Sequence, residues 1–575
     1  MSKALFAIYK NPSEDDIHTL STKICRRIQP DNCGASAPII LKDTNSLSII
    51  YNPGESIIQN ENGICLGVTD SKEGLFEVGS DLPNGSFALF RHNNDYAEVA
   101  TDFASSRTMW YYFDTDVFVA ATSQRMIVAL LGDFQLNEKA CGWFMSSGTL
   151  GPRLSWDKRV SMIEPRTKIV LDKSSWELDI EKEESFHFEK AEESKITKEQ
   201  ARDQFYSIVE NSIKDLKLNP EQWTLALSGG MDSRSLLYHL KDIRLNSVTW
   251  GHSRALDLPF SDACIAKRLA DYCGIDNTYA KMDYQDGSFS STLSRFLGAS
   301  EGRLDHLAAY FDALSVWGNL SKTGRGVIRG YDAFGRKPPV TNSFQVYRNC
   351  NLLFTEYASP IIPQKYQVAE NDIPKDLKRR ENESLENWRD RLWLQHRTPI
   401  TTAALEDIKL SYVEVINPLL NKNIVEAVQK LPIKLRNNKN IWFAIVSRMF
   451  PEIPFARREA VEEVGEVLSL PEVRDYICNG LKRYRSNSLF NEEFMDLLIK
   501  SYTTDEEKYD VKRRMRRLII AYLPKSIENM IRARLKPSMV SNKWIAFRVL
   551  MILKVNDMFQ MDAALKNGIK EKAMA

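Results

Sequence analysis

The stretch that decides the fold is Leu225-Ala226-Leu227-Ser228-Gly229-Gly230-Met231-Asp232-Ser233-Arg234-Ser235. An apolar run begins at Trp223 and stops at the Ser-Gly-Gly turn, and leucines follow at positions 236, 237 and 240. The apolar run predicts a buried strand, and the leucine spacing predicts the first turns of a helix. The sequence therefore places a glycine-rich turn between the end of a strand and the N-terminus of a helix.

The predicted turn has the chemistry of an anion-binding site. Backbone N–H groups and the positive end of a helix dipole favour phosphate, and Gly229 and Gly230 let the backbone approach it closely. Ser228 and Ser233 add hydroxyl donors, whereas Asp232 would repel a bare phosphate, so we expect Asp232 to hold Mg²⁺ against one. An ordinary strand–turn–helix corner is the alternative, but the complete Ser-Gly-Gly-x-Asp-Ser string favours a nucleotide site.

The string resembles the pyrophosphate loop of ATP pyrophosphatases, which cleave ATP between its α and β phosphates and adenylate a carboxylate or carbonyl oxygen. It is not a Walker A loop, because no Gly-Lys-Ser/Thr follows at the required spacing. The resemblance implies ATP and Mg²⁺ as cofactors. Leu227 and Thr249, at strand ends beside the turn, would contact adenine and ribose, although core positions in a sheet would explain them nearly as well.

The composition is that of a globular protein with more than one domain. The 575 residues are 43% hydrophobic and 27% charged, as in soluble proteins. Lys+Arg 77 and Asp+Glu 76 nearly cancel, so we expect neither a nucleic-acid nor a membrane partner. The eight cysteines include no C-x-x-C pair, so neither a zinc site nor a redox motif is indicated. Neither a secretory signal nor an apolar stretch long enough to span a membrane is recognisable, so a reducing cytoplasm is the expected location.

The N-terminal part, residues 1–180, is rich in short β-like runs separated by Asn, Asp, Gly and Pro. We expect it to form an α+β domain built on antiparallel sheet. Residues 181–200 are charged and poor in apolar side chains, and they predict a solvated linker. The expected strands lie at 4–9, 46–51, 87–91, 97–102, 110–113, 117–121 and 167–171, and the expected helices at 13–28 and 123–131.

From residue 201 to 575 the pattern changes to alternating helices and strands, followed by helical periodicity after 401. Such alternation predicts a parallel sheet with helices on both faces, in which ligands lie at the carboxyl ends of the strands. The turns 228–233 and 330–335 both follow strands, so we expect them to line one crevice. The expected strands lie at 223–227, 246–250, 278–282 and 326–329, and the expected helices at 197–216, 261–273, 289–297 and 304–320.

Further stretches make the chain resemble the asparagine synthetase superfamily over nearly its whole length. Glu414-Val415-Ile416-Asn417-Pro418-Leu419-Leu420-Asn421 is similar to the segment Glu-x-Arg-x-Pro-Phe-Leu-Asp of those enzymes, and Gly330-Tyr331-Asp332-Ala333-Phe334-Gly335 looks like an altered Asp-Glu-Leu-Phe-Gly loop. Residues 84–88, 100–102, 107, 110–112 and 121–123 follow the order of the family's glutaminase domain. The resemblance implies a degenerate class II glutamine amidotransferase-like (Ntn-hydrolase-type) sandwich over 1–180. It also implies an α/β parallel-sheet ATP-pyrophosphatase domain with a helical C-terminal part over 201–575.

Position 2 departs from the members of this family that hydrolyse glutamine. Those enzymes carry a nucleophilic cysteine directly after the initiator Met, and its freed α-amine serves as the base. Here the residue is Ser2, a poorer nucleophile than a thiol near neutral pH, and the family's Asn-Gly-Glu glutamine-binding stretch is missing. We therefore predict a glutaminase-like fold without glutaminase activity, with Ser2 an ordinary N-terminal residue.

The resemblance also assigns roles to residues outside the glycine-rich turn. Asp232 and Asp332 would hold Mg²⁺ on the phosphates. As in β-lactam synthetase-like members, Tyr331 and Glu414 would form a dyad that takes the proton from the attacking amine. Arg458 is the cation nearest to the family's adenylate-stabilising Lys or Arg. A packing aromatic and a surface arginine are the alternative explanations for Tyr331 and Arg458.

Three functions follow from this comparison. The first is ATP-dependent amide-bond formation through carboxylate adenylation, with release of AMP and pyrophosphate and without glutamine hydrolysis, as in the lasso-peptide cyclases. The second is an asparagine synthetase, or a related enzyme that amidates a small acid with ammonia, and the third is an inactive nucleotide-binding homologue. The first implies a carboxylate-bearing small molecule or peptide as substrate and, for a cyclase, a precursor peptide and a partner protease.

Overall fold

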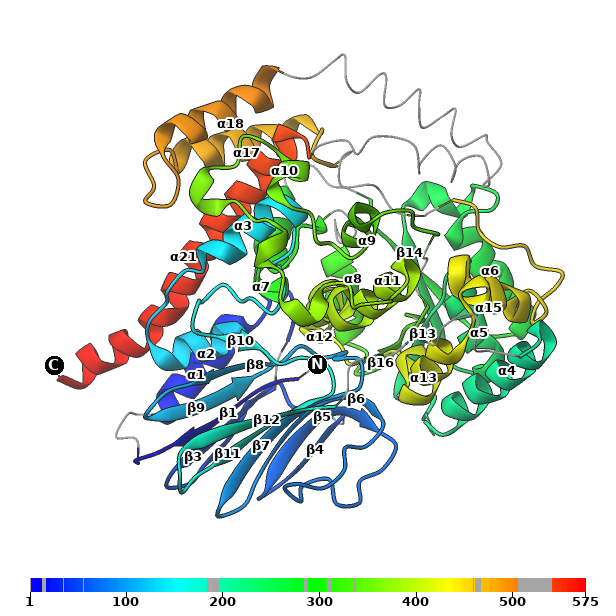
Figure 1. Ribbon diagram of the computed structural model, residues 1–575, viewed down its shortest axis with the longest axis horizontal. Helices are drawn as coiled ribbons and strands as arrows, with labels where there is room; N and C mark the ends of the chain where they lie inside the picture. The colour runs from blue at the N-terminus through cyan, green and yellow to red at the C-terminus, as the bar shows by residue number, and fades with distance from the viewer. Residues whose placement is uncertain are drawn as a thin grey trace.

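The structure is a computed structural model in which β-sheets are packed against helices (Figure 1). It describes residues 2–12, 17–34, 36–54, 56–183, 186, 188, 196–216, 218–283, 288–307, 313–331, 333–334, 338–458, 460, 467–504 and 540–574. Two antiparallel sheets and one parallel sheet account for the named strands of this part of the chain. The fold is therefore a mixed α/β arrangement.

The two antiparallel sheets stack face to face in the N-terminal part (Figure 1). Side chains alternate between the faces of a strand, so in β1 (Lys3–Tyr9) Ala4 and Phe6 point into the core between the sheets, while Leu5 and Ala7 point away from it. The sheet orders are β10-β8-β9-β1-β3-β2 and β12-β11-β7-β6-β5-β4. The other strands are β2 (Ile39–Lys42), β3 (Ser46–Tyr51), β4 (Ile57–Asn60), β5 (Gly63–Thr69), β6 (Gly85–His92), β7 (Tyr96–Thr101), β8 (Trp110–Phe113), β9 (Val117–Ala121), β10 (Ser161–Met162), β11 (Thr167–Asp172) and β12 (Glu177–Lys182).

Helices cover the face of the first sheet that points away from the sandwich core. α1 (Ile17–Ile28) and α2 (Gln124–Leu131) bury Ile24 and Met126 in one cluster with Leu5 and Ala7 of β1. The Ser123 side chain caps α2, and Gly132 in the left-handed region ends it. The antiparallel sheet predicted from the sequence is thus confirmed, whereas α3 (Glu138–Ser147) was not predicted.

The parallel sheet has the order β15-β14-β13-β16-β17. The chain adds β14 and β15 on one side of β13 and then crosses to add β16 and β17 on the other. The strand order therefore reverses between β13 and β16, which is where such sheets bind ligands. The strands are β13 (Trp223–Ala226), β14 (Ser247–Gly251), β15 (Asn277–Lys281), β16 (Gly326–Ile328) and β17 (Val415–Ile416).

Helices lie on both faces of the parallel sheet, as predicted. On one face α4 (Lys198–Lys214), α5 (Met231–Leu240) and α6 (Asp262–Cys273) share a buried cluster with Leu225. Ala226, the next residue of β13, belongs to the cluster on the opposite face. The helices that follow are α7 (Phe289–Ser300), α8 (Ala313–Ser321), α9 (Ser343–Asn349), α10 (Thr355–Ala358), α11 (Leu385–Leu392), a π-helix (Trp393–Thr402), α12 (Ala403–Leu410), α13 (Lys422–Lys430), α14 (Ile433–Arg436) and α15 (Asn440–Val446).

The helix predicted for 304–320 is wrong over its first residues. Leu304 forms an extended bridge with Thr149, and Asp305 donates its backbone N–H to Gly148. The Asp305 carboxylate is buried against Arg548, so a long-range ion pair holds this segment in an extended conformation. The helical periodicity of a sequence gives no information about such a contact between distant residues.

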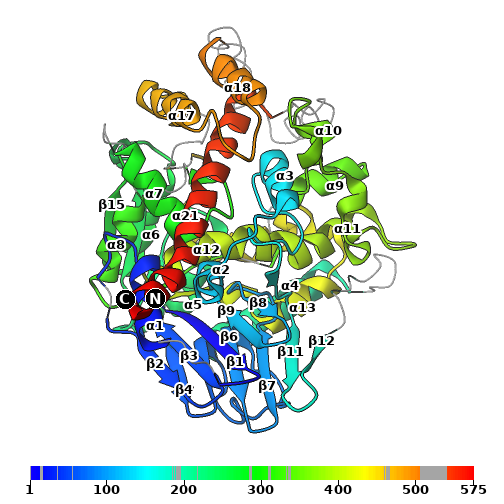
Figure 2. The same cartoon turned by 90° about the vertical axis from the view of Figure 1, so that its left-hand side faces the viewer.

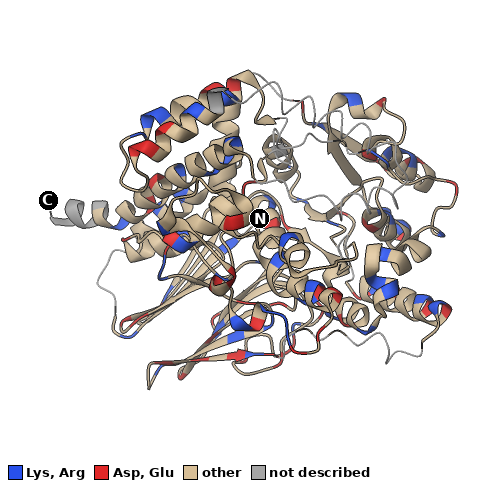
Figure 3. Ribbon diagram, turned by 45° about the horizontal axis from the view of Figure 1, so that its top comes forward, with Lys and Arg blue, Asp and Glu red and all other residues tan. Residues whose placement is uncertain are grey.

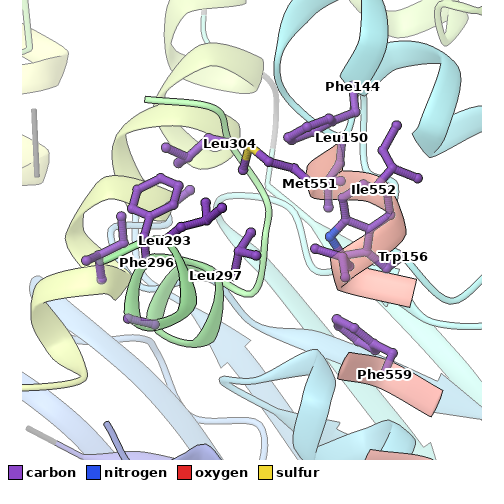
Figure 4. Close-up of a cluster of buried hydrophobic side chains, with 14 of the residues drawn as sticks. Phe144, Leu150, Trp156, Leu293, Phe296, Leu297, Leu304, Met551, Ile552 and Phe559 are labelled. Atoms are coloured by element: carbon purple, nitrogen blue, oxygen red, sulfur yellow. The ribbon is translucent and has the colours of Figure 1, made fainter. Parts of the chain in front are cut away.

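The last helix, α21 (Asn542–Met574), joins the two parts of the chain. It packs against α1, α2 and α3 as well as α17 (Pro471–Arg483) and α18 (Glu492–Thr504) (Figure 2). Figure 4 shows Met551, Ile552 and Phe559 of α21 in a cluster with Trp156 and with side chains from α3 and α7. The C-terminal helix therefore packs on the N-terminal part too, a contact that the prediction of a helical C-terminal part within the domain 201–575 did not include.

The surface and the cysteines agree with the composition. Acidic and basic residues are interspersed along the helices and strands (Figure 3). Within the described residues, every helix is too short or too polar to cross a membrane. All eight cysteines are free thiols.

Candidate nucleotide site

The glycine-rich turn is held by its own hydroxyl groups. The Ser228 backbone N–H donates to Ser233 Oγ at 3.0 Å, and the two hydroxyl oxygens lie 2.9 Å apart. The Gly230 N–H donates to Ser228 Oγ at 3.3 Å, and α5 begins at the next residue. Gly230 offers no side chain to cap α5, so the helix dipole and first-turn N–H groups lie beside an uncapped turn. The strand–turn–helix arrangement predicted from the sequence is confirmed.

A second segment, residues 453–456, lies directly on the turn. A Cβ on Gly229 would stand 2.6 Å from the Ala456 Cβ, and the Ala456 N–H donates to the Gly229 carbonyl at 3.0 Å. Arg234 fixes the segment by donating to the Ile453 carbonyl at 2.8 Å and the Pro454 carbonyl at 2.7 Å. Burial lowers the pKa of Arg234 to about 10, so the guanidinium stays charged at neutral pH. Only a glycine fits at position 229.

The turn after β16 also touches the glycine-rich turn. A Cβ on Gly330 would lie 2.6 Å from the Ser233 backbone nitrogen and 2.8 Å from the Asp232 carbonyl carbon. Positions 232 and 330 are therefore in contact, at the point where the strand order of the parallel sheet reverses. The expected proximity of the two turns is therefore confirmed at positions 232, 233 and 330, whereas a ligand crevice between them stays a prediction.

Asp232 has partners that were not predicted. Lys439 Nζ donates to Asp232 Oδ1 at 3.0 Å and to Oδ2 at 2.8 Å, and Trp442 Nε1 donates to Oδ1 at 2.8 Å. Lys439 is buried and precedes α15 in the left-handed region. No spacing rule links positions 232 and 439, so only the packing of α15 against α5 brings this ammonium group to the turn.

The predicted Mg²⁺ ligands can be tested only in part. Asp332 lies outside the described residues, and in the described ranges no group of three His, Cys, Asp or Glu side chains converges. Lys439 and Trp442 already donate to the Asp232 carboxylate. Mg²⁺ is usually bound through one or two carboxylates together with phosphate oxygens, so its coordination by Asp232 stays a prediction.

The structure does not bring Tyr331 and Glu414 together, so the proposed dyad is corrected. Glu414 directly precedes β17 and lies at the amino end of the sheet, whereas Tyr331 follows the carboxyl end of the parallel neighbour β16. The Glu414 carboxylate pairs with Arg107 and accepts a bond from Ser56 Oγ at 2.7 Å. The Tyr331 hydroxyl instead accepts a bond from Arg397 Nη1 at 3.4 Å.

Arg458 lies beside the turn through its backbone. Its N–H donates to the Phe260 carbonyl at 3.3 Å, and its carbonyl accepts from the Asp262 N–H at 3.0 Å. Asp262 in turn accepts a bond from the Gly229 N–H at 3.2 Å. The Arg458 side chain is exposed, so its role toward an adenylate stays a prediction.

Leu227 and Thr249 are built into the sheet. The Leu227 N–H donates to the Val248 carbonyl at 2.9 Å, and Thr249 Oγ1 donates to the Leu227 carbonyl at 2.8 Å. Both side chains are buried. The Thr249 hydroxyl therefore already has a partner in the sheet, and contact with a nucleotide stays a prediction for both residues.

Ser2 is buried where the N-terminal sandwich meets the rest of the chain. Its hydroxyl has no hydrogen-bond partner in the described residues. Next to it, Lys3 Nζ lies 3.7 Å from the Glu301 carboxylate, which also accepts a bond from Ser123. Buried charged and polar side chains thus surround the N-terminal residues.

Comparison with known proteins leaves the family open. No family model and no curated protein sequence matches the chain. The solved structures that resemble it include the allosteric regulatory enzyme of purine biosynthesis, with 9% identity over 48% of this chain and 80% of that one and a TM-score of 0.21. NMN synthetase from Francisella tularensis is similar with 14% identity over 38% of this chain and 93% of that one and a TM-score of 0.17. They also include glutamine phosphoribosylpyrophosphate amidotransferase from B. subtilis, complexed with ADP and GMP. It has 10% identity over 49% of this chain and 66% of that one, with a TM-score of 0.19. Likeness at this level of identity and TM-score shows nothing about the reaction of this chain.

Proposed function

We propose that the chain is an ATP-dependent amide ligase that adenylates a carboxylate and does not hydrolyse glutamine. The observation that carries the proposal is the hydroxyl-bonded turn at the start of α5, with Gly330 packed on it. Backbone N–H groups and the helix dipole would bind the phosphates of ATP there. The resemblance of this turn to the pyrophosphate loop of ATP pyrophosphatases supports cleavage between the α and β phosphates.

In the first proposed step, a carboxylate oxygen of the substrate attacks the α phosphorus, and pyrophosphate leaves with the electrons of the broken P–O bond. The N–H groups of the turn and the Lys439 ammonium group, next to Asp232, would stabilise the negative charge that develops on pyrophosphate. Mg²⁺, held by Asp232 and phosphate oxygens, would add to this charge neutralisation.

In the second proposed step, an amine attacks the acyl carbon, AMP leaves, and the amine loses a proton. We assign no base on the protein, because Glu414 pairs with Arg107 away from Tyr331. Burial of Ser2, a serine in place of cysteine, supports a nitrogen source other than glutamine. An amine of the substrate itself, as in peptide macrocyclisation, is the source that we propose.

Pyrophosphate release from Mg²⁺-ATP tests the proposal, with pools of carboxylic acids and amine-bearing peptides as substrates. We expect the native chain to release pyrophosphate with at least one pool and Asp232→Ala to reduce the rate by at least 100-fold. Ser2→Ala is the matched control, and it should change neither the rate nor the product. Equal rates of pyrophosphate release from the native chain and from Asp232→Ala would refute the proposed enzymatic activity. Activity that depends on glutamine would refute the proposed nitrogen source.

A further inference from the structure

The long helix beside the candidate site is interrupted by a π-helical stretch. α11 continues through the π-helix Trp393–Thr402 into α12, and the Ala403 N–H donates to the Thr398 carbonyl, five residues back. Pro399 has no N–H to donate, and its ring would clash with the carbonyl four residues earlier, so the helix widens here. Such widened turns are rare and occur often at functional sites.

Arg397 is the basic residue of the π-helix, and its side chain points to the turn after β16. Its guanidinium lies 4.0 Å from the centre of the Trp393 ring, and Nη1 donates to the Tyr331 hydroxyl at 3.4 Å. Tyr331 directly follows Gly330, which touches the start of α5. Since consecutive Cα atoms are about 3.8 Å apart, the Arg397–Tyr331 pair lies at the rim of the nucleotide turn.

The charge of Arg397 has no carboxylate partner in the described residues, unlike that of its neighbours. On α11, Arg389 pairs with Asp390 at 2.8 Å and Arg391 with Glu383 at 2.8 Å. Arg397 is half-buried, and its Nε is buried without a hydrogen-bond partner in the described part of the chain. A cation withdrawn from water without a counter-ion is costly, so an anionic ligand would stabilise it.

We propose that Arg397, together with Tyr331, binds a carboxylate of the acyl substrate other than the one that is adenylated. The inference rests on the proposed function and adds to it the substrate class, a molecule with at least two carboxylates. The stacked guanidinium donates through Nη1 to the Tyr331 hydroxyl, and its planar set of donors can bind both oxygens of a carboxylate, which a lysine cannot do. The Tyr331 hydroxyl, which accepts the Nη1 bond, would lie beside the bound carboxylate.

Binding of diacids and their monoamides tests this site. The probes are succinate with succinamate, glutarate with glutaramate, and adipate with adipamate, titrated calorimetrically in the presence of α,β-methylene-ATP. We expect at least one diacid to bind the native chain ten- to 100-fold more tightly than its monoamide, as one charge-assisted interaction provides. Arg397→Met should abolish this preference, and Arg397→Lys should keep part of it.

The controls separate this inference from the proposed function. Arg348→Met removes an exposed arginine of α9 and should leave the preference unchanged. All variants should bind α,β-methylene-ATP as the native chain does, which shows that they are folded. Failure of the native chain to bind the nucleotide would refute the proposed function. Nucleotide binding without a diacid preference, or a preference that survives in Arg397→Met, would refute the carboxylate site.

Discussion

At the scale of single residues, the contacts of Asp232 change what the glycine-rich turn offers to a nucleotide. A carboxylate at this position would repel phosphate, but Lys439 and Trp442 donate to it and neutralise part of its charge. The Trp442 ring also stacks on Phe334, which fixes the indole at the turn. The ammonium group and the helix dipole thus present positive charge to the same place.

The Asp232–Lys439 pair should contribute to stability as a unit. Each of Asp232→Asn and Lys439→Met leaves a partly buried group without its partner, and each should lower the free energy of unfolding by about 1–3 kcal/mol. The free energy of unfolding of the double variant should fall by less than the sum of the two single losses, because no unpaired charge remains. Urea unfolding of the four proteins measures the coupling, and additive losses would contradict the pairing.

At the scale of elements, the site depends on how closely β16 approaches the N-terminus of α5. No side chain separates the two elements, because Gly330 brings its backbone against Ser233 and Asp232. The close approach places Tyr331, and through it Arg397 of the π-helix, at the nucleotide turn. Two elements about a hundred residues apart in sequence are therefore in direct contact at the candidate site.

Gly330→Ala should weaken ATP binding while the fold is kept. Its Cβ would meet backbone atoms at 2.6 and 2.8 Å, which cannot move as a flexible side chain would, so the turn after β16 must shift away from α5. We expect the Kd for ATP to rise at least tenfold and Tm to fall by a few degrees. Gly34→Ala, where a Cβ would meet nothing within 4 Å, is the control and should change neither. Unchanged ATP affinity in Gly330→Ala would show that this contact does not shape the site.

At the scale of the whole molecule, buried ion pairs join the C-terminal helix to both parts of the chain. Arg125 of α2 donates to Asp562 of α21 at 2.6 Å, and Arg548 of α21 donates to Asp305 at 2.7 Å. The Asp305 carboxylate fills the space over Gly148, where a Cβ would lie 2.5 Å from it. In the hydrophobic cluster of Figure 4, side chains of α21 lie with side chains from α3 and α7, so the two parts should unfold together.

The pairing of Asp305 predicts a loss of stability in acid. Burial would raise the pKa of Asp305, but the Arg548 guanidinium and His306 outweigh it and hold this pKa well below its usual range. A carboxyl with a depressed pKa stabilises the fold above its unfolded pKa, about 3.9, and this contribution is lost as the pH falls below that value. Asp305→Asn should therefore lower Tm at pH 7 and reduce its fall between pH 5 and pH 3. Asp81→Asn, at an exposed position, should behave as the native chain does, and an unchanged acid profile in Asp305→Asn would contradict the prediction.

The local elements around the site could be predicted from the sequence, whereas the partners of the site residues could not. β13 and α5 follow from an apolar run, two glycines and a leucine spacing, all within 20 residues. The Tyr331–Glu414 dyad failed because a resemblance of short segments does not say at which end of the sheet each residue lies. Arg397 was missed because a single arginine in a helical pattern carries no functional signal until its lack of a carboxylate partner is visible.

The sheet types, the glycine-rich turn and the presence of a serine, Ser2, directly after Met1 follow from the sequence alone. These features depend on side-chain periodicity and backbone freedom over a few residues, which neighbours in the chain decide. Only the tertiary structure decided that Lys439 pairs with Asp232, that Glu414 pairs with Arg107, and that α21 packs on the N-terminal part. Such contacts join residues separated by hundreds of positions, and they arise from the packing of whole elements rather than from any local pattern.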